Sequence, residues 1–215
     1  MVLSLNTKQR GNSMREEIYK GFEPLPTDLQ GWQGTSRIFS KLIDEFKPKK
    51  IIEVGSWKGQ STVTMAKACK KLKLDTEIFC VDTWLGAEEF YTEPTPERDL
   101  MCRFGYPQVY YQFLSNIINE EVVDMVNPIT LPSNIAYSIV PNGVDMVYID
   151  ASHSYEDVKS DLRNYFPKVR VGGVIFGDDY TNGAFPGVRK AVDSYVMENK
   201  LKLEVHANWF WVIRK

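Results

Sequence analysis

The chain has 215 residues, of which 43% are hydrophobic, and this is enough to build one domain with a full core. Its formal net charge of -2 gives no electrostatic reason to expect nucleic acid or an anionic membrane as a partner. Apolar runs fall far short of the ~20 residues of a membrane span, and the N-terminus lacks a signal-peptide core, so we expect a cytoplasmic protein.

Residues 1–31 are polar and contain Pro24, Pro26 and Gly31, which predicts a loosely ordered N-terminal arm. Apolar residues at helical spacing follow the arm and predict a helix that stops at Pro48.

Strand and helix patterns alternate through the rest of the chain. Strands are expected at Lys50–Val54, Glu77–Val81, Ile129–Leu131, Val144–Ile149, Val171–Phe176, Lys202–His206 and Trp209–Ile213. Helical spacing is found at Gln60–Leu72, after Pro107, from Tyr155 to Tyr165 and from Val188 to Tyr195. The interval after the second strand, residues 85–127, is rich in aromatic residues and is expected to form a lid insertion.

This alternation predicts an α/β fold with a Rossmann-like, seven-stranded, mostly parallel sheet and helices on both faces. The last two strands are too close in sequence for a crossover helix, so they should form an antiparallel hairpin at the sheet edge. We expect one domain over residues 1–215.

Two glycines, Gly55 and Gly59, join the first strand to a helix. Such glycines allow a tight turn and close backbone approach, and the helix N-terminus offers unpaired N–H groups. Their G-x-x-x-G spacing differs from that of dinucleotide-binding and phosphate-binding loops. Glu53 would repel a phosphate but suits a cationic ligand. The alternative is an ordinary strand-to-helix turn of an α/β protein.

Asp82 ends the second strand, where a carboxylate can accept hydrogen bonds from both ribose hydroxyls of a nucleoside cofactor. Enzymes that bind NAD use the same arrangement, so Asp82 alone does not identify the cofactor. Trp84 is placed either to stack on an adenine or to cap the core under the lid.

Acidic residues follow three of the expected strands, at Asp82, Asp150 and Asp178–Asp179. Each alone is as well explained by a turn or a helix N-cap. Ligands of open α/β sheets bind outside the carboxyl ends of the strands, so four carboxylates at this edge favour a functional site.

Two motifs carry a resemblance to a known family. The fourth strand and its loop read VDMVYIDASHSYEDV, and the fifth strand reads GGVIFGDDY. Together with the glycine turn, they resemble the class I S-adenosylmethionine-dependent methyltransferases, and within them the metal-dependent O-methyltransferases of the macrocin and mycinamicin type, which methylate sugar hydroxyls. The catechol type has Asp-Asn after the fifth strand and a lysine base, and this chain departs from it at both points. The resemblance runs from about Ile51 to the C-terminus.

The resemblance implies a role for each matching residue. Asp150, Asp178 and Asp179 would bind Mg²⁺ or another divalent cation, and His153, with Asp150, would be catalytic, His153 as the general base. His153 is otherwise a turn residue that caps the next helix. S-adenosylmethionine would contact Glu53, Gly55, Ser56, Trp57, Gly59, Ser61, Asp82, Thr83, Trp84, Ser133 and Asp150.

The sequence therefore predicts an S-adenosylmethionine-dependent, metal-assisted O-methyltransferase that acts on a hydroxyl of a sugar or other small molecule. A homo-oligomer is one option for its assembly. Its rivals are a metal-independent methyltransferase with another acceptor, a non-catalytic cofactor-binding subunit, and a relative resembling the cephalosporin hydroxylases on the same scaffold.

Overall fold

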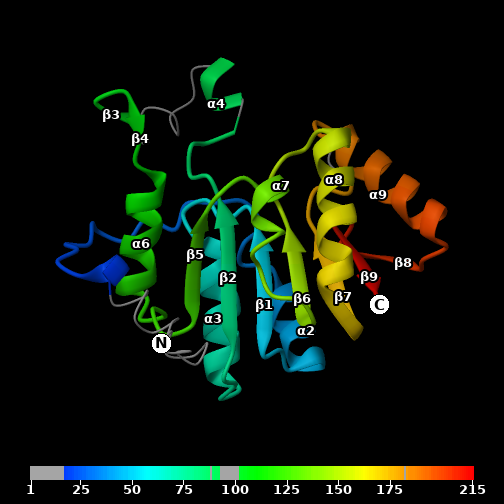
Figure 1. Ribbon diagram of the computed structural model, residues 1–215, viewed down its shortest axis with the longest axis horizontal. Coiled ribbons are helices and arrows are strands. Elements are labelled where there is room, and N and C mark those ends of the chain that lie inside the picture. Colours follow the sequence, from blue (N-terminus) through cyan, green and yellow to red (C-terminus); the bar gives the residue numbers. More distant parts are fainter. Residues whose placement is uncertain (1–16, 88, 93–101, 182) are drawn as a thin grey trace, which may run out of the picture.

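A computed structural model describes residues 17–87, 89–92, 102–181 and 183–215 (Figure 1). Seven strands form one sheet in the order β5-β2-β1-β6-β7-β9-β8. They are β1 (Lys50–Val54), β2 (Glu77–Asp82), β5 (Val126–Thr130), β6 (Val144–Ile149), β7 (Val169–Gly177), β8 (Leu203–His206) and β9 (Phe210–Arg214). The first five strands in this order pair in parallel, whereas β9 runs antiparallel to both β7 and β8. The predicted sheet and its C-terminal hairpin are confirmed.

Helices cover both faces of the sheet. They are α2 (Arg37–Phe46), α3 (Gln60–Lys71), α6 (Val109–Asn119), α7 (Ser133–Ala136), α8 (Tyr155–Tyr165), followed by a 3-10 turn at Phe166–Lys168, and α9 (Pro186–Asn199). One apolar layer lies under α2, α3 and α6, and a second lies under α7, α8 and α9. Adjacent strand residues alternate between the layers, as Ile51 and Ile52 do, because side chains of a strand point to opposite faces.

The third expected strand differs from the observed one. The sequence predicts it at Ile129–Leu131, but β5 runs over Val126–Thr130 and includes Asn127 and Pro128. These two residues break the apolar pattern on which the expectation depended. Proline is tolerated because β5 is the edge strand and pairs only with β2.

The inserted segment rises above the carboxyl ends of the strands (Figure 1). It contains α4 (Glu89–Thr92) and the two-stranded pair of β3 (Cys102–Arg103) and β4 (Tyr106–Pro107). Residues 88 and 93–101 of the predicted lid, like residues 1–16 of the predicted arm, lie outside the described residues. Helix α6 follows β4 within the inserted segment, and its residues Phe113 and Ile117 belong to the main core.

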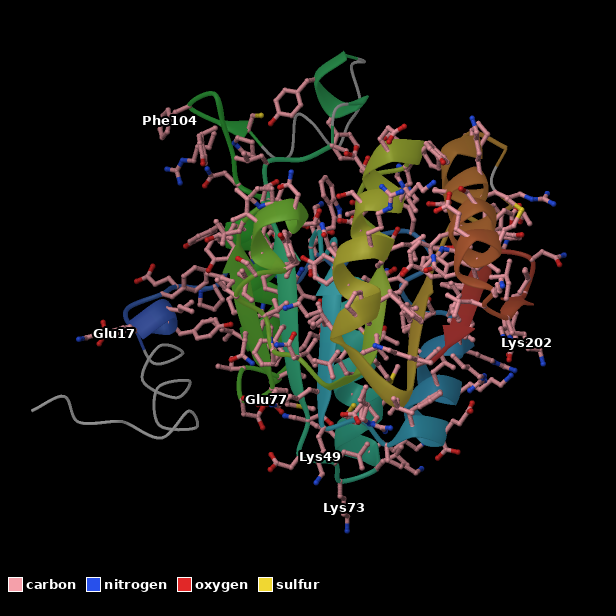
Figure 2. All side chains as sticks on the ribbon, turned by 45° about the vertical axis from the view of Figure 1, so that its right-hand side comes forward. Glu17, Lys49, Lys73, Glu77, Phe104 and Lys202 are labelled. Atoms are coloured by element: carbon pink, nitrogen blue, oxygen red, sulfur yellow. The ribbon has the colours of Figure 1, made fainter. Side chains whose placement is uncertain are left out.

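The two edges of the sheet differ in what they carry. Lys49, Lys73 and Glu77 lie at the amino edge, and Phe104 lies beyond the opposite, carboxyl edge (Figure 2). Ligands of open α/β sheets bind at the carboxyl edge, so the predicted ligand-binding residues are expected there.

Of the helices in the described part of the chain, none is long and apolar enough to cross a membrane.

Candidate active site

The glycine turn is pressed against the loop that follows β6. Gly55 has a φ of +86°, and a Cβ built on it would lie 2.0 Å from the carbonyl oxygen of Asp150. Backbone hydrogen bonds close this junction, from Gly55 N to Val81 O at 2.9 Å and from Asp150 N to Val54 O at 2.8 Å. Both the conformation and the contact require glycine, and they bring the turn directly beside Asp150.

Asp82 holds the same turn from the other side. Its Oδ2 accepts hydrogen bonds from the backbone N–H groups of Ser56 and Trp57, each at 2.8 Å, and its Oδ1 accepts one from Trp84 N at 2.7 Å. The carboxylate therefore shapes the turn in addition to the predicted contact with a ribose. Thr83 beside it is exposed, and its Oγ1 accepts a hydrogen bond from Leu85 N at 3.3 Å.

A buried polar cluster lies beneath the turn. The fully buried carboxylate of Glu53 accepts hydrogen bonds from Ser56 Oγ at 2.8 Å, from Ser61 Oγ at 2.5 Å and from Thr62 Oγ1. Burial raises the pKa of Glu53, and these hydroxyl donors oppose the rise. The side chains of Glu53, Ser56 and Ser61 satisfy one another, so they support the backbone that would meet the cofactor. Sequence reasoning missed Thr62.

The two tryptophans of the predicted cofactor site differ in exposure. Trp84 is only 2% exposed, packs against Phe113 with ring centroids 4.9 Å apart, and donates from Nε1 to Trp57 O at 2.8 Å. It therefore caps the core, which was one of its two expected roles. Trp57 is half-buried, and its ring meets Trp32 and Phe90 at 5.8 and 4.9 Å.

Ser133, the first residue of α7, is turned toward α8. Its hydroxyl is hydrogen-bonded to Asp161, and its carbonyl oxygen accepts a hydrogen bond from Tyr165 Oη at 2.9 Å. The structure thus does not bring the Ser133 side chain to the glycine turn.

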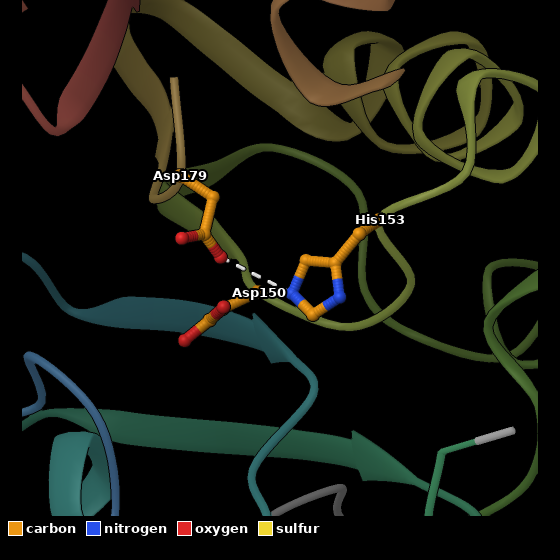
Figure 3. Close-up of side chains that lie close together, drawn as sticks. All are labelled: Asp150, His153 and Asp179. Atoms are coloured by element: carbon orange, nitrogen blue, oxygen red, sulfur yellow. Dashed lines mark ion pairs between the residues drawn. The ribbon is translucent and has the colours of Figure 1, made fainter. Parts of the chain in front are cut away.

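Two of the predicted metal ligands and the predicted general base lie together in the loops that follow β6 and β7. Ligand atoms of Asp150, His153 and Asp179 all lie within 4.8 Å of one another. His153 Nε2 lies 3.1 Å from Asp179 Oδ2 (Figure 3). A small pocket contains these side chains and is lined by Ile149, Asp150, Ala151, Ser152, His153, Val158, Asp178, Asp179, Val188 and Trp211.

The His153 ring is held on its face as well. It stacks on Phe185 with centroids 3.8 Å apart and planes at 11°. The N-cap of α8 is Ser154, whose Oγ accepts a hydrogen bond from Asp157 N, so His153 is not the helix cap. Sequence reasoning missed Phe185, because only the fold brings the loop before α9 to this ring.

Asp178 lies beside the three gathered groups. It is 5% exposed, and its Oδ1 accepts a hydrogen bond from Asp179 N at 2.7 Å. Tyr148, which sequence reasoning also missed, donates from Oη to Asp150 Oδ2 at 2.8 Å. Its signal was its spacing, because residues two apart on a strand share a face.

The carboxyl groups at this edge repel one another. Burial and the charge of Asp179 raise the pKa of Asp150 to about 6. The hydrogen bond from Tyr148 and the charge of His153 act in the opposite direction and lower it. Burial, with the charges of Asp150 and Asp179, raises the pKa of Asp178 to about 8. Crowded carboxylates of this kind fit a divalent cation, for which carboxylate oxygens are the preferred ligands and whose charge would offset the repulsion.

The pH dependence of stability follows from Asp178. Its folded pKa is raised to about 8, whereas an unfolded aspartate has a pKa of about 3.9. Between these values the folded chain holds the proton that the unfolded chain has lost, so the free energy of unfolding falls as the pH rises from about 4 to about 8. We expect a lower Tm at pH 8 than at pH 6 in EDTA, and Asp178→Asn should shrink this difference. An equal pH response of wild type and variant would contradict the assignment.

Comparisons with known proteins identify the family of this chain and its fold. The profile of a family described as a methyltransferase domain matches residues 52–180. The uncharacterized protein y4gI of Sinorhizobium fredii is 29% identical over 140 residues, which cover 64% of this chain but only 14% of that protein.

Solved structures share the fold at low sequence identity. The SAH-bound methyltransferase PaMTH1 of Podospora anserina has a TM-score of 0.63 at 14% identity, covering 100% of this chain and 98% of that one. The O-methyltransferase TomG of Streptomyces achromogenes, which is involved in tomaymycin synthesis and was solved with SAM, has a TM-score of 0.61 at 15% identity, covering 100% and 92%.

Proposed function

This chain belongs to the methyltransferase domain family, and we propose that it transfers a methyl group from S-adenosylmethionine to a hydroxyl of a sugar or another small molecule, assisted by a divalent cation. The family membership confirms the predicted methyltransferase. The observation that carries the finer proposal is the gathering of Asp150, His153 and Asp179 beside the glycine turn. The SAH in PaMTH1 and the SAM in TomG support the choice of cofactor.

The glycine turn and Asp82 position the cofactor in this proposal. When bound, S-adenosylmethionine supplies an electrophilic methyl group on its sulfonium. The backbone of Gly55–Gly59 and the N-terminus of α3 would face it, and Asp82 lies at the carboxyl end of β2, where a ribose would be bound. The chain's task is then to hold an acceptor hydroxyl in line with the methyl group and to remove its proton.

His153 is the proposed general base. With Nε2 donating to Asp179, the neutral ring has its lone pair on Nδ1, and this nitrogen takes the proton of the acceptor hydroxyl. General base catalysis of this kind contributes about 10²–10⁴-fold. A divalent cation held by Asp150 and Asp179, with Asp178 beside them, would lower the pKa of the hydroxyl and so assist His153.

Chelation tests the proposal. Protein treated with EDTA should lose methyl transfer from radiolabelled S-adenosylmethionine to a panel of glycosides and polyols, and excess Mg²⁺ should restore it. The expected loss is large because the acceptor hydroxyl would no longer have a cation that lowers its pKa. Unchanged transfer by the EDTA-treated protein would contradict the role of the metal and favour the rival, a metal-independent methyltransferase in which the aspartates are polar loop residues.

A further inference from the structure

The end of the N-terminal arm lies across α6. Within the segment Leu25–Gly34, Leu25 N donates to Ser115 Oγ at 3.0 Å, and Asp28 N donates to Asn116 Oδ1 at 2.9 Å. Ser115 and Asn116 are buried polar residues of α6 and are 0% exposed. Side chains of one helix thus satisfy the backbone of a segment that has no regular structure of its own.

The same segment contacts the glycine turn through an ion pair in which the lysine is buried and the Asp28 side chain is 43% exposed. Asp28 Oδ2 lies 2.7 Å from Lys58 Nζ, and the Lys58 side chain is 3% exposed. Asn116 Nδ2 donates to both Asp28 O and Lys58 O, each at 2.7 Å. Lys58 lies between the two glycines of the turn. A buried ammonium needs its partner, because an uncompensated buried charge is strongly destabilising.

Further contacts place the segment over the start of α3. Gln60 Nε2 donates to Leu29 O at 2.7 Å, and Trp57 Nε1 donates to Gln30 Oε1 at 3.1 Å. A Cβ built on Gly34 would lie 2.9 Å from the backbone nitrogen of Ser61. The segment Leu25–Gly34 therefore reaches the first turn of α3, the helix whose N-terminus would face the cofactor in the proposed function.

We infer that the segment Leu25–Gly34 is a wall of the cofactor site and that Asp28 is a positioning residue, acting through Lys58 on the glycine turn. The inference rests on the proposed function. Trp57, a residue with a Cβ, has a positive φ of 50°, so the turn is held in a conformation that costs energy. A segment that fixes this conformation before binding reduces the ordering cost that the cofactor would otherwise meet.

Calorimetry with SAH tests this role. Asp28→Asn removes the charge at constant shape and should weaken SAH binding at least 10-fold, measured at a temperature where circular dichroism shows the variant folded. The matched control is Glu120→Gln, which breaks the ion pair of α3 residue Lys67 farther along the helix and should leave the SAH affinity within twofold of wild type. A role in stability alone would lower Tm and leave the SAH affinity of Asp28→Asn unchanged, and this result would overturn the inference.

A milder variant decides the case in which Asp28→Asn does not fold. Gln60→Ala keeps the ion pair but loses the bond to Leu29 O and the side chain that lies beside Gly31 and Gly34, and it should weaken SAH binding by about threefold or more. Unchanged affinity in this variant would also overturn the inference. Wild-type protein that binds no SAH would instead contradict the proposed function, so the two failures are distinguishable.

Discussion

Replacement of His153 by glutamine should lower the turnover number by about 10²–10⁴-fold, the usual contribution of a general base. Glutamine is polar and of similar size, so it can occupy the place between Phe185 and Asp179, but it cannot take a proton from the acceptor. The affinity for SAH should stay near that of wild type, because His153 acts mainly in the transition state. Single-turnover kinetics and calorimetry with SAH measure the two quantities.

The chain contains a matched control for this variant. His206 is the second of the two histidines and lies in β8, where Nε2 is 3.3 Å from Glu204 Oε2. His206→Gln should keep its turnover within about twofold of wild type. A near-normal turnover in His153→Gln would show that another group takes the proton, and His153 would then be a packing partner of Phe185.

Replacement of Gly55 by alanine should lower the free energy of unfolding by about 2–5 kcal/mol, combining a left-handed backbone cost with overpacking. The new Cβ would lie 2.0 Å from Asp150 O and 2.5 Å from Asp150 C. Neither strand can move away cheaply, since hydrogen bonds join Gly55 N to Val81 O and Asp150 N to Val54 O. Chemical denaturation measures the loss, and SAH binding should fall with it because the turn itself is displaced.

Gly143→Ala separates the clash from the backbone cost. Gly143 has a φ of +69°, and a Cβ there would meet nothing within 4 Å. This variant should therefore lose only about 1–2 kcal/mol. Equal losses in the two variants would show that the contact between the turn and Asp150 adds nothing to stability.

Much of the fold was predictable because its signals are local. The alternation of apolar strands with helices was enough to predict the parallel sheet. The short interval between β8 and β9 was enough to predict the hairpin. The carboxyl-edge rule grouped the aspartates, the family resemblance added His153, and the structure places Asp150, Asp179 and His153 together. These predictions depend on the spacing of apolar residues and on the order of strands and helices, and both can be read from the sequence of each segment.

The finer arrangement of the site depends on contacts between distant segments. Nothing local indicates that Asp82 binds backbone N–H groups of the turn, or that Trp84 is covered by α6. A pair of adjacent aspartates likewise does not reveal which one pairs with His153, since Asp179 has a left-handed φ of 60° that only the finished loop sets.

The central position of β1 determines when the site is assembled during synthesis. β1 pairs with β2, which follows it closely, and with β6, which emerges from the ribosome much later. A nascent chain that stops before Val144 leaves one edge of β1 open to other chains and has neither Asp150 nor His153. Parallel pairing of distant segments also slows folding. The unfinished chain should therefore be the aggregation-prone species, and the glycine turn meets Asp150 only after synthesis has passed β6.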